Sequence, residues 1–118
     1  MAKKAPGVRF WHSRKMTLDG AALGFDALAA LATTAPGLQS VSELTKTMSI
    51  GRNSVKSAIL ANVLLALHKV GAIEADGKVS RFRIAGDLTK VTITDYGRQL
   101  LRENRDRMDF ARTLLERS

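Results

Sequence analysis

The first apolar pattern in the chain has the spacing of an amphipathic helix. Between Asp19 and Thr34 apolar residues recur every three or four positions, and Pro36-Gly37 follows as a helix-ending pair. Thr17 or Asp19 is placed to cap the start of this helix. The inward positions are Leu23, Ala27, Ala30 and Leu31. The pattern therefore predicts a slim, alanine-rich first helix that is suited to close packing.

A second, shorter helix is predicted from about Val41 to Met48. Ser40 or Ser42 is the candidate for its N-cap, and Glu43 stands in the first turn, where the helix dipole favours a negative charge. The segment Ser49-Ile50-Gly51 follows as a tight connector. This order predicts two helices joined by a short turn.

The third predicted helix starts near Asn53 or Ser54 and runs to Val70, with Gly71 as the expected stop signal. Its apolar residues share helical spacing and define an inward face that Leu60 and Leu64 widen. The other members of this face are Val55, Ile59, Val63, Leu67 and Val70. The pattern predicts a long helix with one buried side.

After the third helix the periodicity changes to that of strands. Residues 72–74 are expected to form a short strand, and residues 79–84 and 90–94 alternate between two faces. In residues 79–84 this alternation turns Phe82 inward, and the outward side chains are Val79, Arg81 and Arg83. Two antiparallel strands, 79–84 and 90–94, are therefore predicted to form a hairpin.

The last segment, residues 95–118, is predicted to be helical, with Thr94 or Asp95 as its cap. We expect it to pair two subunits through the apolar residues Leu101, Met108, Leu114 and Leu115. The predicted fold is α+β and mostly helical: a winged helix-turn-helix with three helices, a β-hairpin wing and a C-terminal helix. The expected organisation is a basic N-terminal arm in residues 1–16, a winged-helix DNA-binding domain in residues 17–94 and a C-terminal helix for dimerisation in residues 95–118.

Composition adds a preference for polyanionic partners. Nineteen Lys and Arg oppose eleven Asp and Glu, which gives a net charge of +8, and hydrophobic residues make up 45% of the 118-residue chain. One domain with a modest core is expected. The chain has no cysteine, so neither disulfides nor thiolate metal sites are expected. No apolar run is long enough to cross a bilayer, and a cytoplasmic, nucleoid-associated protein is the default expectation.

Polar and basic side chains cluster at two places that a winged helix presents to DNA. One is the start of the third helix, which lies in the major groove, where Arg reads guanine and Asn reads adenine. The other is the hairpin wing. The candidate DNA-binding residues are Arg52, Asn53, Ser54, Lys56, Ser57, Lys78, Arg81 and Arg83. An ordinary capped and solvated helix start carries the same residue types, and that alternative stays open.

Three segments resemble the MarR-type and PadR-type winged-helix regulators, and together they cover about residues 22–103. Residues 43–55 resemble the helix-turn-helix of these families, and residues 67–73 resemble the exit from their recognition helix. Residues 91–101 resemble their closing pattern. The matching sequences are Glu43-Leu44-x3-Met48-x-Ile50-x3-Ser54-Val55, Leu67-x3-Gly71-Ala72-Ile73 and Val91-x-Ile93-Thr94-Asp95-x-Gly97-Arg98-x-Leu100-Leu101. The resemblance implies a transcription regulator, such as a repressor, that binds double-stranded DNA as a homodimer.

The motifs that the sequence lacks favour a binding protein over an enzyme. The sequence has no Ser/His/Asp set, no phosphate-binding loop and no acidic cluster with metal spacing, so no catalytic residue, cofactor or metal is expected. His12 and His68 are isolated and are expected to be structural. The alternatives to a regulator are a winged-helix module for protein or RNA interaction, and nucleoid or plasmid-partition DNA binding.

Overall fold

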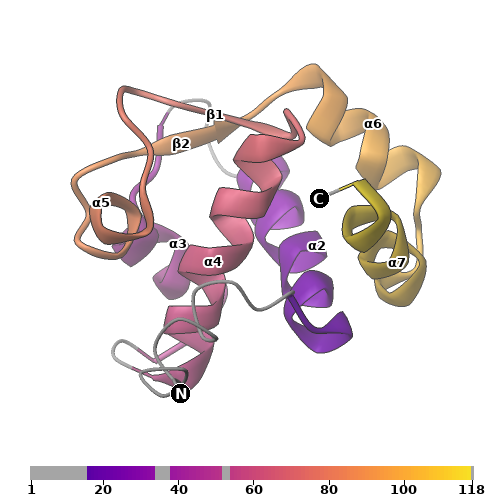
Figure 1. The fold of residues 1–118 in the computed structure, drawn as a ribbon, viewed down its shortest axis with the longest axis horizontal. Helices are drawn as coiled ribbons and strands as arrows, with labels where there is room; N and C mark the ends of the chain where they lie inside the picture. The colour runs from indigo at the N-terminus through magenta and orange to yellow at the C-terminus, as the bar shows by residue number, and fades with distance from the viewer. Residues whose placement is uncertain (1–15, 34–37, 52–53, 118) are drawn as a thin grey trace, which may run out of the picture.

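The computed structural model describes residues 16–33, 38–51 and 54–117 (Figure 1). This part of the chain is α+β and mostly helical, as predicted. Its elements are α2 (Leu18–Thr33), α3 (Val41–Thr47), α4 (Val55–Lys69), β1 (Ile73–Ala75), α5 (Arg81–Ala85), β2 (Val91–Ile93), α6 (Asp95–Glu103) and α7 (Arg107–Arg117). The predicted N-terminal arm, apart from Met16, lies outside the described residues. None of the described helices is long and apolar enough to cross a bilayer.

The starts of α2 and α3 are fixed by hydroxyl caps, as the sequence predicts. The Thr17 hydroxyl accepts the N–H of Gly20 at 3.0 Å. Ser40 and Glu43 form a capping box: the Ser40 hydroxyl accepts the Glu43 N–H at 3.2 Å, and the Glu43 carboxylate accepts the Ser40 N–H at 2.8 Å. Each pair satisfies backbone donors that lack a partner within the helix.

We expect the capping box to make stability depend on pH. The hydrogen bond from the Ser40 backbone N–H, and then that with the Ser40 side chain, lowers the pKa of the Glu43 carboxyl. A carboxyl with a lowered pKa in the folded state stabilises the protein above its unfolded pKa, and this contribution disappears as the pH falls through the folded pKa. Urea unfolding should therefore show that Glu43→Gln destabilises the protein at pH 7 and has a smaller effect near pH 3. An equal effect at both pH values would contradict this role of the charge.

Helix α2 forms the centre of the core. It lies between α4 and α7 and contacts both (Figure 1). A Cβ atom on Gly24 would lie 3.0 Å from Val63 Cγ1 and 3.3 Å from Leu114 Cδ2, so the small residues of α2 permit a close approach from either side. The fully buried large side chains at this centre include Leu28 of α2 itself and, from α4 and α7 on its two sides, Leu60, Val63, Leu64, Leu67, Phe110 and Leu114.

The prediction of one continuous C-terminal helix is wrong. The segment forms two helices, because the chain leaves helical geometry at Asn104, with φ −123° and ψ 87°. The Asn104 side chain stabilises this break by donating to the Leu100 carbonyl at 3.0 Å and accepting from the Thr113 hydroxyl at 3.1 Å. Arg107, at the start of α7, forms a two-bond ion pair with Asp26 of α2 at 2.9 and 3.0 Å. Helix α7 therefore folds back onto α2.

This packing changes the expected dimer surface. Leu114 is only 1% exposed, because it packs inside the core of its own chain. Leu101, Met108 and Leu115 are half-buried against the same core. The prediction that Leu114 contacts a partner subunit is therefore wrong. The other three residues keep part of their surface outside the core.

The predicted hairpin of residues 79–84 with residues 90–94 is also wrong. Strand β2 pairs antiparallel with β1, with Ile73 opposite Ile93, and Val91 forms a bridge with Gln39 on its other side. Both edges of β2 are thus occupied, which leaves no edge for residues 79–84. That segment instead contains the one-turn helix α5, whose N-cap Ser80 accepts the Arg83 N–H at 3.1 Å.

Candidate nucleic-acid interface

The turn between α3 and α4 is closed by backbone hydrogen bonds that stop α3 sharply. The N–H of Ile50 donates to the Thr45 carbonyl at 2.8 Å, and the N–H of Ser49 donates to the Lys46 carbonyl at 3.2 Å. Ser49 has φ +59°, the left-handed conformation that this Schellman pattern requires after a helix. Ile50 packs partly against the core. The turn therefore holds α4 in a defined orientation relative to α3.

The start of α4 combines a rigid cap with an exposed cation. The Ser54 hydroxyl donates to the Gly51 carbonyl at 2.6 Å and accepts the Ser57 N–H at 3.2 Å. Lys56 is exposed, and Ser57 is half-buried. Of the predicted site residues in this cluster, Ser54 is used as a cap and Lys56 is the charge presented to solvent. Arg52 and Asn53 lie outside the described residues.

The outward face of α4 differs from the predicted one at its first residue. Val55, expected on the inward face, is 77% exposed, because the buried face is centred on Leu60 and Leu64. Asn62 is half-buried and Lys69 exposed, and both follow Val55 at intervals of seven residues, or about two helical turns. Asn62 and Lys69 are therefore candidate contacts that the sequence analysis missed. The sequence alone gave no signal for them, because their seven-residue spacing from Val55, expected on the inward face, would have placed them inward too.

In the segment between β1 and β2, the structure corrects the predicted orientation of the Arg83 side chain. Its Nε donates to the Lys78 carbonyl at 3.1 Å and to the Thr89 hydroxyl at 3.0 Å, and its Nη2 donates to the Leu88 carbonyl at 3.1 Å. The half-buried Arg83 thus ties the loop together instead of facing outward from a strand. Lys78 is exposed and Arg81 is half-buried.

The same segment is joined to α3 and α4. Asp87, with φ +61°, accepts the Ser42 N–H at 2.9 Å through one carboxylate oxygen and the Ser42 hydroxyl through the other. Ile84 of α5 is fully buried, and α5 contacts α4. In Figure 1, α5 lies beside α3 and α4. The structure therefore brings the α5 segment and the helix-turn-helix together as one packed unit.

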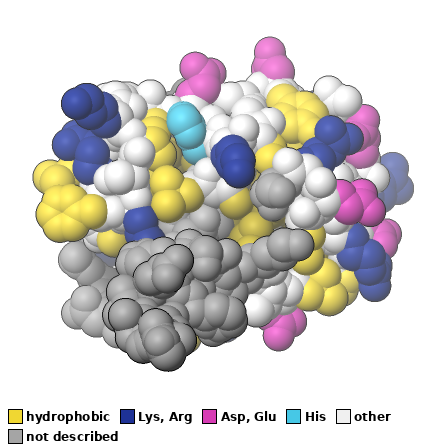
Figure 2. Space-filling model, in the orientation of Figure 1, with side chains coloured by type: hydrophobic (Ala, Val, Ile, Leu, Met, Phe, Trp, Pro, Cys, Tyr) yellow, Lys and Arg dark blue, Asp and Glu magenta, His cyan; other side chains and the backbone are white. Residues whose placement is uncertain are grey.

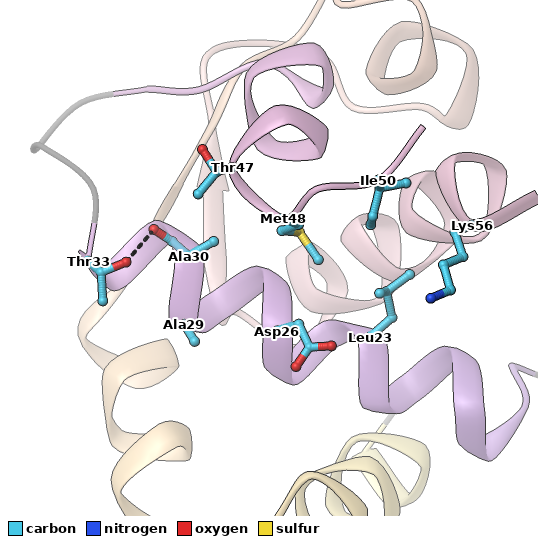
Figure 3. Close-up of a pocket in the computed structure, with 9 residues that line it drawn as sticks. All are labelled: Leu23, Asp26, Ala29, Ala30, Thr33, Thr47, Met48, Ile50 and Lys56. Atoms are coloured by element: carbon cyan, nitrogen blue, oxygen red, sulfur yellow. Dashed lines mark hydrogen bonds between the residues drawn. The ribbon is translucent and has the colours of Figure 1, made fainter. Parts of the chain in front are cut away.

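A shallow groove of about 390 Å³ lies where α2 meets the turn and the start of α4. In Figure 3, Met48 and Ile50 of the turn lie opposite Leu23 of α2, and Lys56 enters from α4. Asp26, on the α2 side, is already paired with Arg107. The apolar lining shows how the turn rests on α2, and it places Lys56 at one end of this surface.

No metal-binding arrangement is present in the described part of the chain, where no three His, Asp or Glu side chains gather. Comparison of the chain with protein families, curated proteins and solved structures finds no significant match. A function for this chain is therefore inferred from the chemistry of its own described residues.

Proposed function

We propose that this protein binds double-stranded DNA through a winged-helix arrangement. In this proposal α3, the turn and α4 form the helix-turn-helix, and β1, β2 and the segment between them form the wing. The order of paired segments, Gln39 next to β2 and β2 next to β1, is compatible with the small sheet of a winged helix. The closed turn after α3 gives the fixed helix orientation that reading a groove requires.

The observation that carries the proposal is the exposed, capped start of α4 in a strongly basic chain. Lys56 stands in the first turn of a 15-residue helix, where the helix dipole adds positive potential. The net charge of +8 favours a polyanion, because each phosphate contact releases condensed counterions. In this docking α4 lies in the major groove, with Lys56 on a phosphate and Asn62 and Lys69 on the outward face.

A regulator of this kind acts by occupying its operator and blocking polymerase. If two copies bind together, their half-sites form an inverted repeat about one helical turn apart. The partly exposed Leu101, Met108 and Leu115 are then the apolar residues that remain for contact between subunits. A cytoplasmic location, next to the nucleoid, follows from the same proposal.

Removal of the Lys56 charge tests this site. We expect Lys56→Ala to weaken binding to duplexes of every sequence and to reduce the slope of log affinity against log salt by about one, as for one lost phosphate contact. The matched control is Arg102→Ala, which removes one exposed charge from α6. Fluorescence anisotropy with labelled duplexes at several salt concentrations measures both. Equal changes in the two variants would contradict the placement of Lys56 at the interface.

A further inference from the structure

The segment between β1 and β2 holds two large apolar side chains in solvent. Phe82 is 76% exposed and Leu88 is 53% exposed. A Cβ atom on Gly86 would lie 3.2 Å from the Phe82 carbonyl oxygen and 3.9 Å from Leu88 Cγ, so the two residues flank the same turn. Figure 2 shows hydrophobic side chains beside Lys and Arg at the edge where Figure 1 places α5. The alternation in the sequence predicted the opposite, with Phe82 inward.

The loop that carries Phe82 is held by the residues that follow it. The next residue, Arg83, donates three hydrogen bonds to the loop, and Ile84 is fully buried against the core. Asp87 ties the end of the turn to Ser42 of α3. Burial of a phenylalanine ring stabilises a fold, and the ring of Phe82 contributes little in this way because it is 76% exposed. A rigid support with an exposed ring is suited to insertion into a partner.

Charge around the ring favours a polyanionic partner. Lys78 and Lys90 are exposed on the two sides of the loop. The carboxylates of Asp76 and Asp87 are both turned to the protein, where they accept the N–H of Lys90 at 2.9 Å and the N–H of Ser42 at 2.9 Å. Two apolar side chains also cover much less than the roughly 800 Å² per partner of a stable protein interface. Nucleic acid is therefore the favoured occupant.

We propose that Phe82, supported by Leu88, is a wedge that enters a base step of duplex DNA from the minor groove. This inference rests on the proposed function, because α5 packs on the helix that is placed in the major groove. Single strands are usually held by several stacked rings, whereas Phe82 is the one mostly exposed aromatic side chain among the described residues. Apolar wedges unstack one step and kink the duplex, and the flexible TA and CA steps yield most easily.

The test is a DNA-bending measurement. A 30-base-pair duplex of about three helical turns, with a central TA step, carries a donor and an acceptor at its ends, and energy transfer reports the end-to-end distance. We expect the wild-type protein to bend the duplex. Phe82→Ala should remove the bend and weaken binding about tenfold, the loss typical of one stacked aromatic side chain. Leu38→Ala, which shortens another exposed apolar residue, is the matched control and should behave like the wild type.

The outcomes separate the wedge from the proposed function. If the wild type and Phe82→Ala bind and bend the duplex equally, the wedge is overturned and duplex binding stands. If Phe82→Ala loses affinity only for single-stranded DNA or RNA, the ring stacks on unpaired bases and the duplex wedge is overturned. If the wild type does not bind duplex DNA at low salt, both proposals fail. An unchanged melting temperature of Phe82→Ala excludes unfolding as the cause of any loss.

Discussion

Replacing Phe110 with alanine should lower the free energy of unfolding by about 4 kcal/mol, within the range typical of a buried phenylalanine. Phe110 is 1% exposed and packs edge-to-face on Phe25 of α2, with the ring centres 5.6 Å apart. It also lies where α7 crosses Gly24, since a Cβ on that residue would be 3.4 Å from the Phe110 ring. The substitution therefore opens a cavity between α2 and α7 that neither helix can readily close.

Urea unfolding measures this loss, and Phe82→Ala is the matched control. The control deletes the same ring from a 76% exposed position, so its expected effect is within about 0.5 kcal/mol of zero. Because Phe110 packs within its own chain, the loss should be the same at low and high protein concentrations. Similar losses in the two variants, or a loss that appears only at low concentration, would contradict the packing of α7 on α2.

Gly97→Ala is expected to cost about 3 kcal/mol, because the new methyl group would collide with backbone. A Cβ atom at this position would lie 2.3 Å from the Ala72 carbonyl oxygen and 2.8 Å from Ile93 Cγ1. The Ala72 carbonyl accepts the N–H of Thr94 at 3.1 Å. Relief of the collision would therefore disturb the junction at which the sheet enters α6.

Gly51→Ala is the control for this substitution. The nearest atom to a Cβ on Gly51 is Ser54 Cβ at 3.9 Å, an ordinary van der Waals distance. Thermal or urea unfolding of both variants should show a large loss for Gly97→Ala and a small change for Gly51→Ala. If Gly97→Ala unfolds at the same midpoint as the wild type, α6 does not approach the Ala72 carbonyl closely enough to exclude a methyl group.

The elements that the sequence predicted well are those with local signals at their ends. Ser40, Ser54 and Thr94 each stand directly before a helix and cap it through their hydroxyl groups. Gly71 has φ +88° just after α4, as a C-terminal stop requires. These signals depend on one turn of chain, so the bounds of α3 and α4 and the start of α6 were predicted to within about one or two residues.

The elements that the sequence predicted poorly are determined by contacts between residues far apart in the chain. Residues 79–84 alternate like a strand, but both edges of β2 are taken by β1 and Gln39, so the segment forms α5. Likewise, no proline or glycine marks the break at Asn104, which depends on its side-chain bond to Thr113 and on the ion pair of Arg107 with Asp26. Tertiary contacts of this kind leave no trace in periodicity.

The candidate site was predicted only in part, because some of its residues follow local signals and others depend on distant contacts. The position of Lys56 follows from the helix start, and the structure describes it as an exposed residue there. The outward orientation predicted for Arg83 was wrong, because it was inferred from a strand that does not form. Phe82 and Asn62 were missed, since their exposure depends on the packing of α5 and on the exact centre of the buried face of α4.

Duplex binding by the purified wild-type chain is the most direct test of the central claim. Fluorescence anisotropy compares a labelled random-sequence duplex DNA with a matching single-stranded RNA at two salt concentrations. The proposed function predicts tight binding of the duplex that falls steeply as the salt concentration rises, because phosphate contacts release counterions. No binding of the duplex at low salt would contradict it.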